Sequence, residues 1–178
     1  VSFVSNALSG GAADDPGIIE FGAHQVDVDT VQGEAWSRMS TMNQAVFFAD
    51  NKAVSPRFVH PETYNHALSA DSPLIDAGRF LTRTVGAGQG RVVPVEDAAY
   101  FYDGFGIEGE LGDLIAVGSA DQLARVVAVD HVNNTLTLDR DVEWDDGVPV
   151  DFPWSGSAPD IGVYEHGAGA RPAVQVTA

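Results

Sequence analysis

Aromatic side chains gather between residues 100 and 154 of this sequence. Sugars stack on exposed aromatic rings, and neighbouring carboxylates can accept hydrogen bonds from the sugar hydroxyl groups. Trp144 and Trp154 lie in polar, turn-like contexts, which predicts that their rings are exposed; Tyr102 and Phe105 complete a candidate carbohydrate-binding set. Aromatic residues also form the cores of small β domains, so packing in a core is the alternative and commoner role for this set.

Acidic residues concentrate in a glycine-rich segment, residues 103–113. Asp103, Glu108, Glu110 and Asp113 there supply carboxylate oxygens, the ligands that Ca²⁺ prefers. Their spacing differs from that of an EF-hand loop, so a solvated acidic loop is the competing interpretation. Calcium is the one cofactor that the sequence suggests.

Other chemistry has little support in the sequence. The chain has no cysteine, which excludes disulfides and thiolate metal sites. It has no Gly-x-Ser-x-Gly motif, and its Gly86–Gly90 segment lacks the Lys-Ser/Thr of a phosphate-binding loop. His60, Glu62 and His66 could hold a metal, although loop histidines beside prolines are more often ordinary surface residues. No residue stands out as catalytic, so an enzyme is the less favoured interpretation for this chain alone.

The net charge is −17, from 26 acidic and 9 basic residues. Such a surface repels phosphate backbones, so we expect neither nucleic acid nor an anionic membrane as partner. Lys52 is the single lysine, and acidic proteins poor in lysine are typical of marine or halophilic sources. Bound calcium would be another explanation of the excess charge. No apolar run approaches the ~20 residues of a membrane-spanning helix, so we expect no span.

Abundant glycine and proline favour short strands joined by turns. Residues 92–150 predict an antiparallel sheet of four to six strands curled into a barrel, with a tight hairpin at Asn133-Asn134. Upstream, the alternation in 26–31 predicts a strand, and residues 34–50 fit either a short helix or the last strands of a coil. Phe58-Val59 and Leu74-Ile75 each predict a short strand. Residues 96–101 fit one helical turn.

Two separated segments match a known pattern. Residues 55–61 are Ser-Pro-Arg-Phe-Val-His-Pro, followed by Leu68 and by Asp-Ser-Pro-Leu-Ile-Asp-Ala-Gly at 71–78; residues 159–165 are Pro-Asp-Ile-Gly-Val-Tyr-Glu. The pattern resembles the closing signature of right-handed parallel β-helix repeat proteins, in which "Asp-Pro-x-Phe-Val-Asp-Pro" and "Ser-Pro-Ala-Ile-Asp-Ala-Gly" precede "Asp-Ile-Gly-Ala-Tyr-Glu". Ser55 and His60 replace acids of that pattern, and the segment between its halves is unusually long.

The resemblance implies a scaffold end that needs capping, because a β-helix finishes in an open apolar cross-section and unpaired strand edges. Asp76 and Asp160 are short acceptors for backbone N–H groups. Gly78 and Gly162 would permit tight reversals. Tyr164 would help to cover the open end.

These observations predict an all-β fold: terminal coils of a parallel β-helix in residues 1–83, an inserted small antiparallel β-barrel in 84–154, and a closing strand and tail in 155–178. The function they favour is a non-catalytic C-terminal capping and carbohydrate-binding module of a secreted β-helix protein. A polysaccharide or cell-surface glycan would be its partner, and exposed β edges would permit self-association.

Two alternatives stay open: a fragment of an extracellular polysaccharide lyase, hydrolase or epimerase, and a structural cell-surface or adhesin segment. The chain starts Val-Ser-Phe-Val, which favours a fragment of a longer protein over one from which a signal peptide has been removed.

Overall fold

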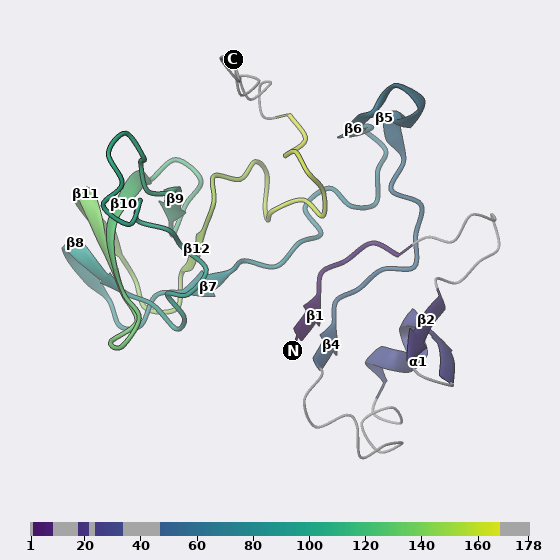
Figure 1. The fold of residues 1–178 in the computed structure, drawn as a ribbon, viewed down its shortest axis with the longest axis horizontal. Coiled ribbons are helices and arrows are strands. Elements are labelled where there is room, and N and C mark those ends of the chain that lie inside the picture. Colours follow the sequence, from purple (N-terminus) through teal and green to yellow (C-terminus); the bar gives the residue numbers. More distant parts are fainter. Residues whose placement is uncertain (1, 9–17, 22–23, 34–46, 168–178) are drawn as a thin grey trace. The chain divides into compact units, whose positions relative to one another are not determined.

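The computed structural model describes residues 2–8, 18–21, 24–33 and 47–167, and it divides into two compact units (Figure 1). Unit 1 combines Val1–Arg79 with Ser155–Ala178, and unit 2 is Phe80–Trp154. The described residues are mostly in strands and turns, which confirms the prediction of an all-β protein. The middle of the chain therefore folds as one unit, while the segments on either side of it share the other.

Unit 2 is a six-stranded antiparallel sheet in the order β7-β12-β9-β10-β11-β8. Its edge strands meet where Thr84 and Val95 form an antiparallel bridge, beside which the Val85 N–H donates to the Pro94 carbonyl at 2.9 Å. The sheet is thus curled into a half-barrel, in agreement with the predicted curled antiparallel sheet. Its strands are β7 (Thr82–Arg83), β8 (Gly88–Pro94), β9 (Leu114–Val117), β10 (Leu123–Asp130), β11 (Thr135–Trp144) and β12 (Pro149–Asp151).

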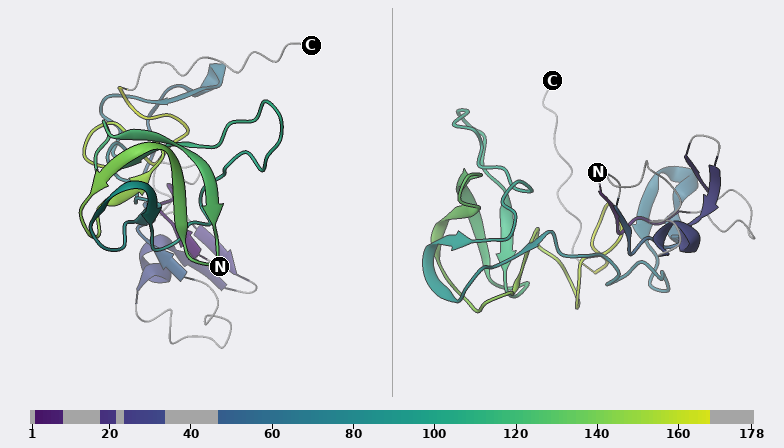
Figure 2. Two further views of the ribbon diagram at one scale, coloured as in Figure 1. Left: turned by 90° about the vertical axis from the view of Figure 1, so that its left-hand side faces the viewer. Right: turned by 90° about the horizontal axis from the view of Figure 1, so that it is seen from below.

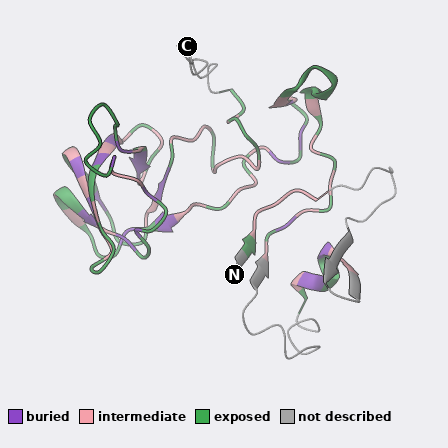
Figure 3. Cartoon of the chain, in the orientation of Figure 1, coloured by how far each residue is buried: buried purple, intermediate pink, exposed green. Residues whose placement is uncertain are grey.

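The core of unit 2 follows from the alternation of its strands. Buried and less buried positions alternate along the first half of both β10 and β11, which turns one face of the sheet inward (Figure 3). Irregular pairing within both strands adds the bend that lets the sheet curl. Asn134 adopts a left-handed φ of 51° in the turn between them, as its place in the predicted hairpin requires. The largest fully buried side chains of this unit are Val93, Ile115, Val117, Val126, Leu136, Leu138 and Val150.

Unit 1 is built from short pairs of strands. Strand β1 (Ser2–Val4) pairs in parallel with β4 (Phe47–Ala49), β2 (Ile18–Phe21) pairs antiparallel with β3 (His24–Asp27), and β5 (Phe58–His60) pairs antiparallel with β6 (Asn65–Leu68). A short helix α1 (Val28–Gln32) follows β3, and a 3-10 turn η2 (Pro61–Thr63) joins β5 to β6. Within the part of the chain that the structure describes, β1–β4 is the only parallel strand pair, and a β-helix is not seen.

The β1–β4 pair places two similar segments in register. The pairing continues beyond the strands to a parallel bridge between Ala7 and Lys52. Asn6 and Asn51, which are 45 residues apart, each follow a residue with φ of 55°, and the Asn6 side-chain N–H donates to Asn51 Oδ1 at 2.8 Å. The Gln32 side chain joins them by donating to the Asn51 carbonyl at 3.1 Å. Nearly buried Asn51 is satisfied by these bonds, so the network holds the stacked pair together.

Five local predictions have different outcomes. The strand expected over 26–31 ends at Asp27, because the Asp27 carboxylate accepts from the Thr30 N–H at 2.6 Å and caps α1, which buries Val28 and Val31 on one face. Phe58-Val59 lies in β5 as predicted, whereas Leu74-Ile75 forms a turn. Residues 96–101 form a single turn closed by Phe101 N–H to the Ala98 carbonyl at 3.3 Å, so the helical prediction is wrong. Most of the ambiguous segment 34–50 lies outside the described residues.

Candidate functional site

The two halves of the resemblance lie together in unit 1. The Asp76 N–H donates to Asp160 Oδ1 at 2.8 Å, and the Gly78 N–H donates to the Pro159 carbonyl at 2.7 Å. In return, Asp76 Oδ1 accepts from the N–H groups of Ser157 at 2.9 Å and Ala158 at 3.3 Å. We call the contacts between residues 74–78 and 155–166 the clasp. The predicted role of Asp76 and Asp160 as acceptors for backbone N–H groups matches these contacts.

Glu165 completes the clasp from within its second segment. Its Oε1 accepts from the Asp160 N–H at 3.0 Å and its Oε2 from the Ser155 N–H at 3.1 Å, while Asp160 Oδ2 accepts from the His166 N–H at 2.5 Å. Sequence reasoning overlooked Glu165, although it ends the matched pattern. Its position in that pattern was the available signal.

Two glycines of the clasp lie so close to neighbouring atoms that a side chain would not fit. A Cβ on Gly78 would lie 2.7 Å from the Pro159 carbonyl oxygen, and a Cβ on Gly156, which has φ of +83°, would collide with the Asp76 carboxylate. Gly162 is different, because a Cβ there would make only ordinary contacts with Leu68, so no tight reversal explains this glycine. Tyr164 is 50% exposed, and its role in covering a scaffold end stays a prediction.

Unit 2 presents an aromatic pair on the segment that leads into β9. We call residues 102–113 the aromatic loop; it stands out from the strands in the two views of Figure 2. The rings of Tyr102 and Phe105 meet edge to face with their centroids 5.0 Å apart. Phe105 is 74% exposed and has a left-handed φ of 47°, and Ile107 and Leu111 are also exposed. A bulky residue in this conformation at an exposed position is unusual, and such outliers are concentrated at functional sites.

Two aspartates anchor the aromatic loop. The Asp113 N–H donates to the Tyr102 carbonyl and the Tyr102 N–H donates to Asp113 Oδ2, both at 2.8 Å. Asp103 Oδ1 accepts from the Phe105 N–H at 2.9 Å, and its Oδ2 accepts from the Val129 N–H of β10 at 3.2 Å. The loop is therefore held at its base, and the backbone of Phe105 is held directly.

The base of the loop is also tightly packed. A Cβ on Gly112 would collide with the Val126 carbonyl oxygen, and the Arg125 guanidinium donates to the Gly112 carbonyl at 2.5 Å. The Arg125 N–H in turn donates to Asp139 Oδ1 at 2.9 Å. Hydrogen bonds from the Arg140 side chain and from the Arg125 backbone hold the pKa of Asp139 well below its usual value. This chain of contacts links the loop to the centre of the sheet.

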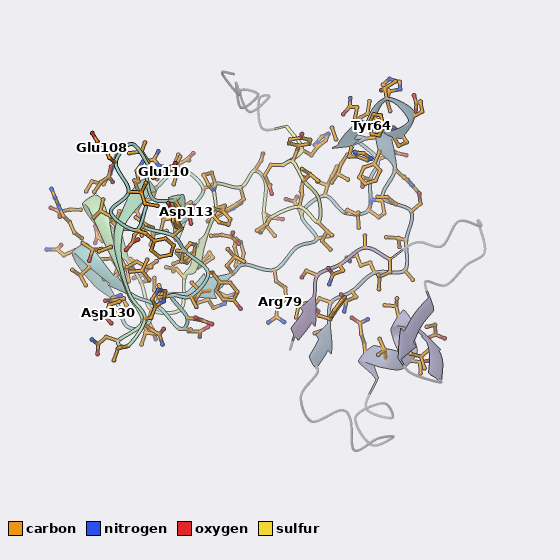
Figure 4. All side chains as sticks on the ribbon, viewed as in Figure 1. Tyr64, Arg79, Glu108, Glu110, Asp113 and Asp130 are labelled. Atoms are coloured by element: carbon orange, nitrogen blue, oxygen red, sulfur yellow. The ribbon has the colours of Figure 1, made fainter. Side chains whose placement is uncertain are left out.

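The four residues of the predicted calcium site divide into two pairs, and Figure 4 labels three of them, Glu108, Glu110 and Asp113. The Asp103 and Asp113 carboxylates already accept backbone N–H groups, whereas Glu108 and Glu110 are exposed. In the described part of the chain, no three acidic or histidine side chains come together in a way that could hold a metal ion. The four carboxylates thus do not converge, because two of them stabilise the loop itself. Calcium binding stays a prediction that the loop geometry does not favour.

The two tryptophans of the candidate sugar set have different surroundings. Trp144 is 7% exposed, its indole N–H donates to the Gly86 carbonyl at 3.0 Å, and its ring fills the space where Gly88 would carry a Cβ. The prediction that Trp144 is exposed is therefore wrong: the alternation of β11 turns this last residue of the strand inward. Trp154 is partly exposed and packs edge to face on Phe80 at 5.0 Å. Of the four aromatic candidates, only Tyr102 and Phe105 are brought together.

A polar hollow on unit 2 was not foreseen from the sequence. It has a volume of about 400 Å³ and is lined by Gln89, Gly90, Gln122, Asp141, Val142 and Glu143. The Gln122 side chain is engaged there, because it donates to the carbonyls of Val117 at 2.7 Å and Glu143 at 2.8 Å. The hollow lies where the register between β8 and β11 shifts, and no sequence pattern predicted that shift.

Comparison with known proteins adds no family to this description. Scans against family models, curated sequences and solved structures found no match to the chain. No helix among the described residues is long and apolar enough to cross a membrane.

Proposed function

We propose that this chain is a non-catalytic module of a secreted protein, in which unit 2 binds carbohydrate through the aromatic loop. The observation that carries this proposal is the Tyr102–Phe105 pair: one ring is largely exposed, the other backs it edge to face, and two aspartates hold the backbone that carries them. A sugar ring stacked on Phe105 would gain apolar burial without ordering the loop, because the loop is already ordered.

We further propose that unit 1 closes the end of a parallel β-helix. Two observations support this proposal: the parallel stacking of residues 2–8 on 47–52, with its paired asparagines, and the clasp that joins the two halves of the resemblance. An arrangement of this kind explains how a scaffold can carry a separately folded unit between Arg79 and Ser155.

Affinity electrophoresis of the full chain tests carbohydrate binding. Gels containing hydroxyethyl cellulose, xylan, glycol chitin, chitosan or polygalacturonate would be compared with an empty gel. We expect at least one polysaccharide to retard the protein, and Phe105→Ala to weaken that binding roughly tenfold or more, since burial of a phenylalanine side chain contributes about 1.5–3 kcal/mol.

Tyr64→Ala is the matched control. Tyr64 is also aromatic, exposed (87%) and left-handed (φ of 61°), but it belongs to unit 1. Its loss should leave binding unchanged. No retardation in any gel, or equal binding by wild type and Phe105→Ala, would refute the proposal.

A further inference from the structure

The charged side chains that the aromatic loop itself carries are all acidic, and the cation at its base is the Arg125 guanidinium, which donates to the Gly112 carbonyl. Between Arg91 and Arg125 the sequence contains no lysine, arginine or histidine, but it contains seven acidic residues: Glu96, Asp97, Asp103, Glu108, Glu110, Asp113 and Asp121. Along this segment, the exposed apolar side chains of Phe105, Ile107 and Leu111 therefore have only acidic residues as charged sequence neighbours.

Glu108 and Glu110 differ from the anchoring aspartates. Both are exposed, and among the described residues no hydrogen bond or ion pair engages either carboxylate. Because the contacts that shape the loop use Asp103 and Asp113, the two glutamates, on the same loop as the aromatic pair, are left without a partner in the described part of the chain. Their negative charge therefore acts on any charged ligand that binds to this loop.

The rings and the carboxylates favour the same kind of ligand. The face of an aromatic ring attracts a cation, and the two glutamates attract it as well. Uronic acid or sulfated sugars would be repelled by the same carboxylates, and a neutral sugar could donate hydrogen bonds to them but would gain no attraction between opposite charges. Charge complementarity therefore favours a cationic ligand on the exposed apolar side chains of the aromatic loop.

We propose that the aromatic loop binds an amino-sugar polymer with free, protonated amino groups. Sugar rings stack on Phe105, and their ammonium groups pair with Glu108 and Glu110. This inference rests on the proposed carbohydrate binding and specifies its ligand class.

The test is a calorimetric titration of the full chain with a matched pair of ligands. The β-1,4-linked glucosamine hexamer and its N-acetylated counterpart share one backbone and differ in charge. The titration is run in a mildly acidic, low-salt buffer, in which the amino groups of the glucosamine hexamer are protonated. We expect the glucosamine hexamer to bind roughly tenfold more tightly, with an advantage that shrinks as salt is added.

Two variants separate charge from stacking. The double variant Glu108→Gln/Glu110→Gln should bring the two affinities close together while leaving the affinity for the acetylated hexamer unchanged. Asp121→Asn removes one carboxylate beyond the opposite end of β9 and should preserve the difference. Urea unfolding of each variant checks that it is folded, and substitution of exposed glutamates should not alter that.

Three other results of these titrations would count against the amino-sugar proposal. Equal affinities in wild type would overturn the inference and leave the proposed function standing; binding of neither hexamer would also overturn the inference, and the polysaccharide gels would then decide the proposed function. A lysine hexapeptide is the third ligand. If it binds as tightly as the glucosamine hexamer and is as sensitive to Phe105→Ala, the partner is a basic protein segment and the amino-sugar assignment is wrong.

Discussion

The clasp makes a quantitative prediction at Asp76. The side chain of Asp76 accepts two backbone N–H groups from residues more than 80 positions away, and its own backbone has a left-handed φ of 54°. Asp76→Ala removes the acceptor and leaves a β-carbon in a conformation that alanine disfavours. Loss of charged-acceptor bonds at this exposed site should cost about 1.5–3 kcal/mol in total, and the left-handed alanine about 1 kcal/mol more.

Two further substitutions divide that cost. Asp76→Asn keeps Oδ1 as an acceptor and tolerates the left-handed region, so its cost should stay below about 1 kcal/mol. Asp76→Gly removes the acceptor without backbone strain and should lie between asparagine and alanine.

Hydrogen exchange at the Ser157 amide is the direct assay, because local opening of the clasp exposes it. A loss of about 2.5–4 kcal/mol corresponds to exchange that is about 70-fold to 1,000-fold faster in Asp76→Ala. The Val126 amide in unit 2 is the internal control, and its exchange rate should not change. If Asp76→Ala left Ser157 exchange unaltered, or if Asp76→Asn matched it, the hydrogen-bond account of the clasp would be wrong.

Two predictions concern unit 2. Gly112→Ala should lower the free energy of unfolding by more than about 3 kcal/mol, because a Cβ at Gly112 has no space. Gly106, which has φ of +69° and open space around it, is the control, and Gly106→Ala should cost only about 1 kcal/mol. Urea unfolding followed by tryptophan fluorescence measures both values, and equal losses would contradict the packing at Gly112. Because the pKa of Asp139 is lower in the folded state than in the unfolded chain, its contribution to stability is present above about pH 4 and is lost as the pH falls below that value. Stability measured from neutral to acidic pH should therefore fall less steeply in Asp139→Asn than in wild type, and parallel curves would argue against this role.

Much of unit 2 could be predicted from the sequence because its strands are local patterns. The pattern along residues 125–129 and 135–138, with Asn-Asn between them, predicts two antiparallel strands and their turn; the structure has both, in the longer strands β10 and β11. Predictions failed where a single side chain overrides periodicity. Val26, Val28 and Val31 suit a strand, but the Asp27 carboxylate caps a helix within the same residues.

The candidate site shows the same limit. The sequence shows that residues 100–113 are aromatic, acidic and rich in glycine, but not which rings are exposed. The sequence neighbours of Trp144 are as polar as those of Trp154. Trp144 is buried because, as the last residue of β11, it points to the core side of the sheet. The exposure of a ring depends on residues distant in the chain, such as Gly86 and Gly88 beside Trp144.

The sequence by itself determined the composition of this protein: short strands, a strong negative charge, and two separated segments of matching pattern. Only the tertiary structure decided what each carboxylate does. Asp76, Asp103, Asp113 and Asp160 accept backbone N–H groups, while Glu108 and Glu110 stay exposed. The reason is physical: a carboxylate is engaged when folding brings an unpaired N–H within about 3 Å of it, and most of those N–H groups come from another part of the chain.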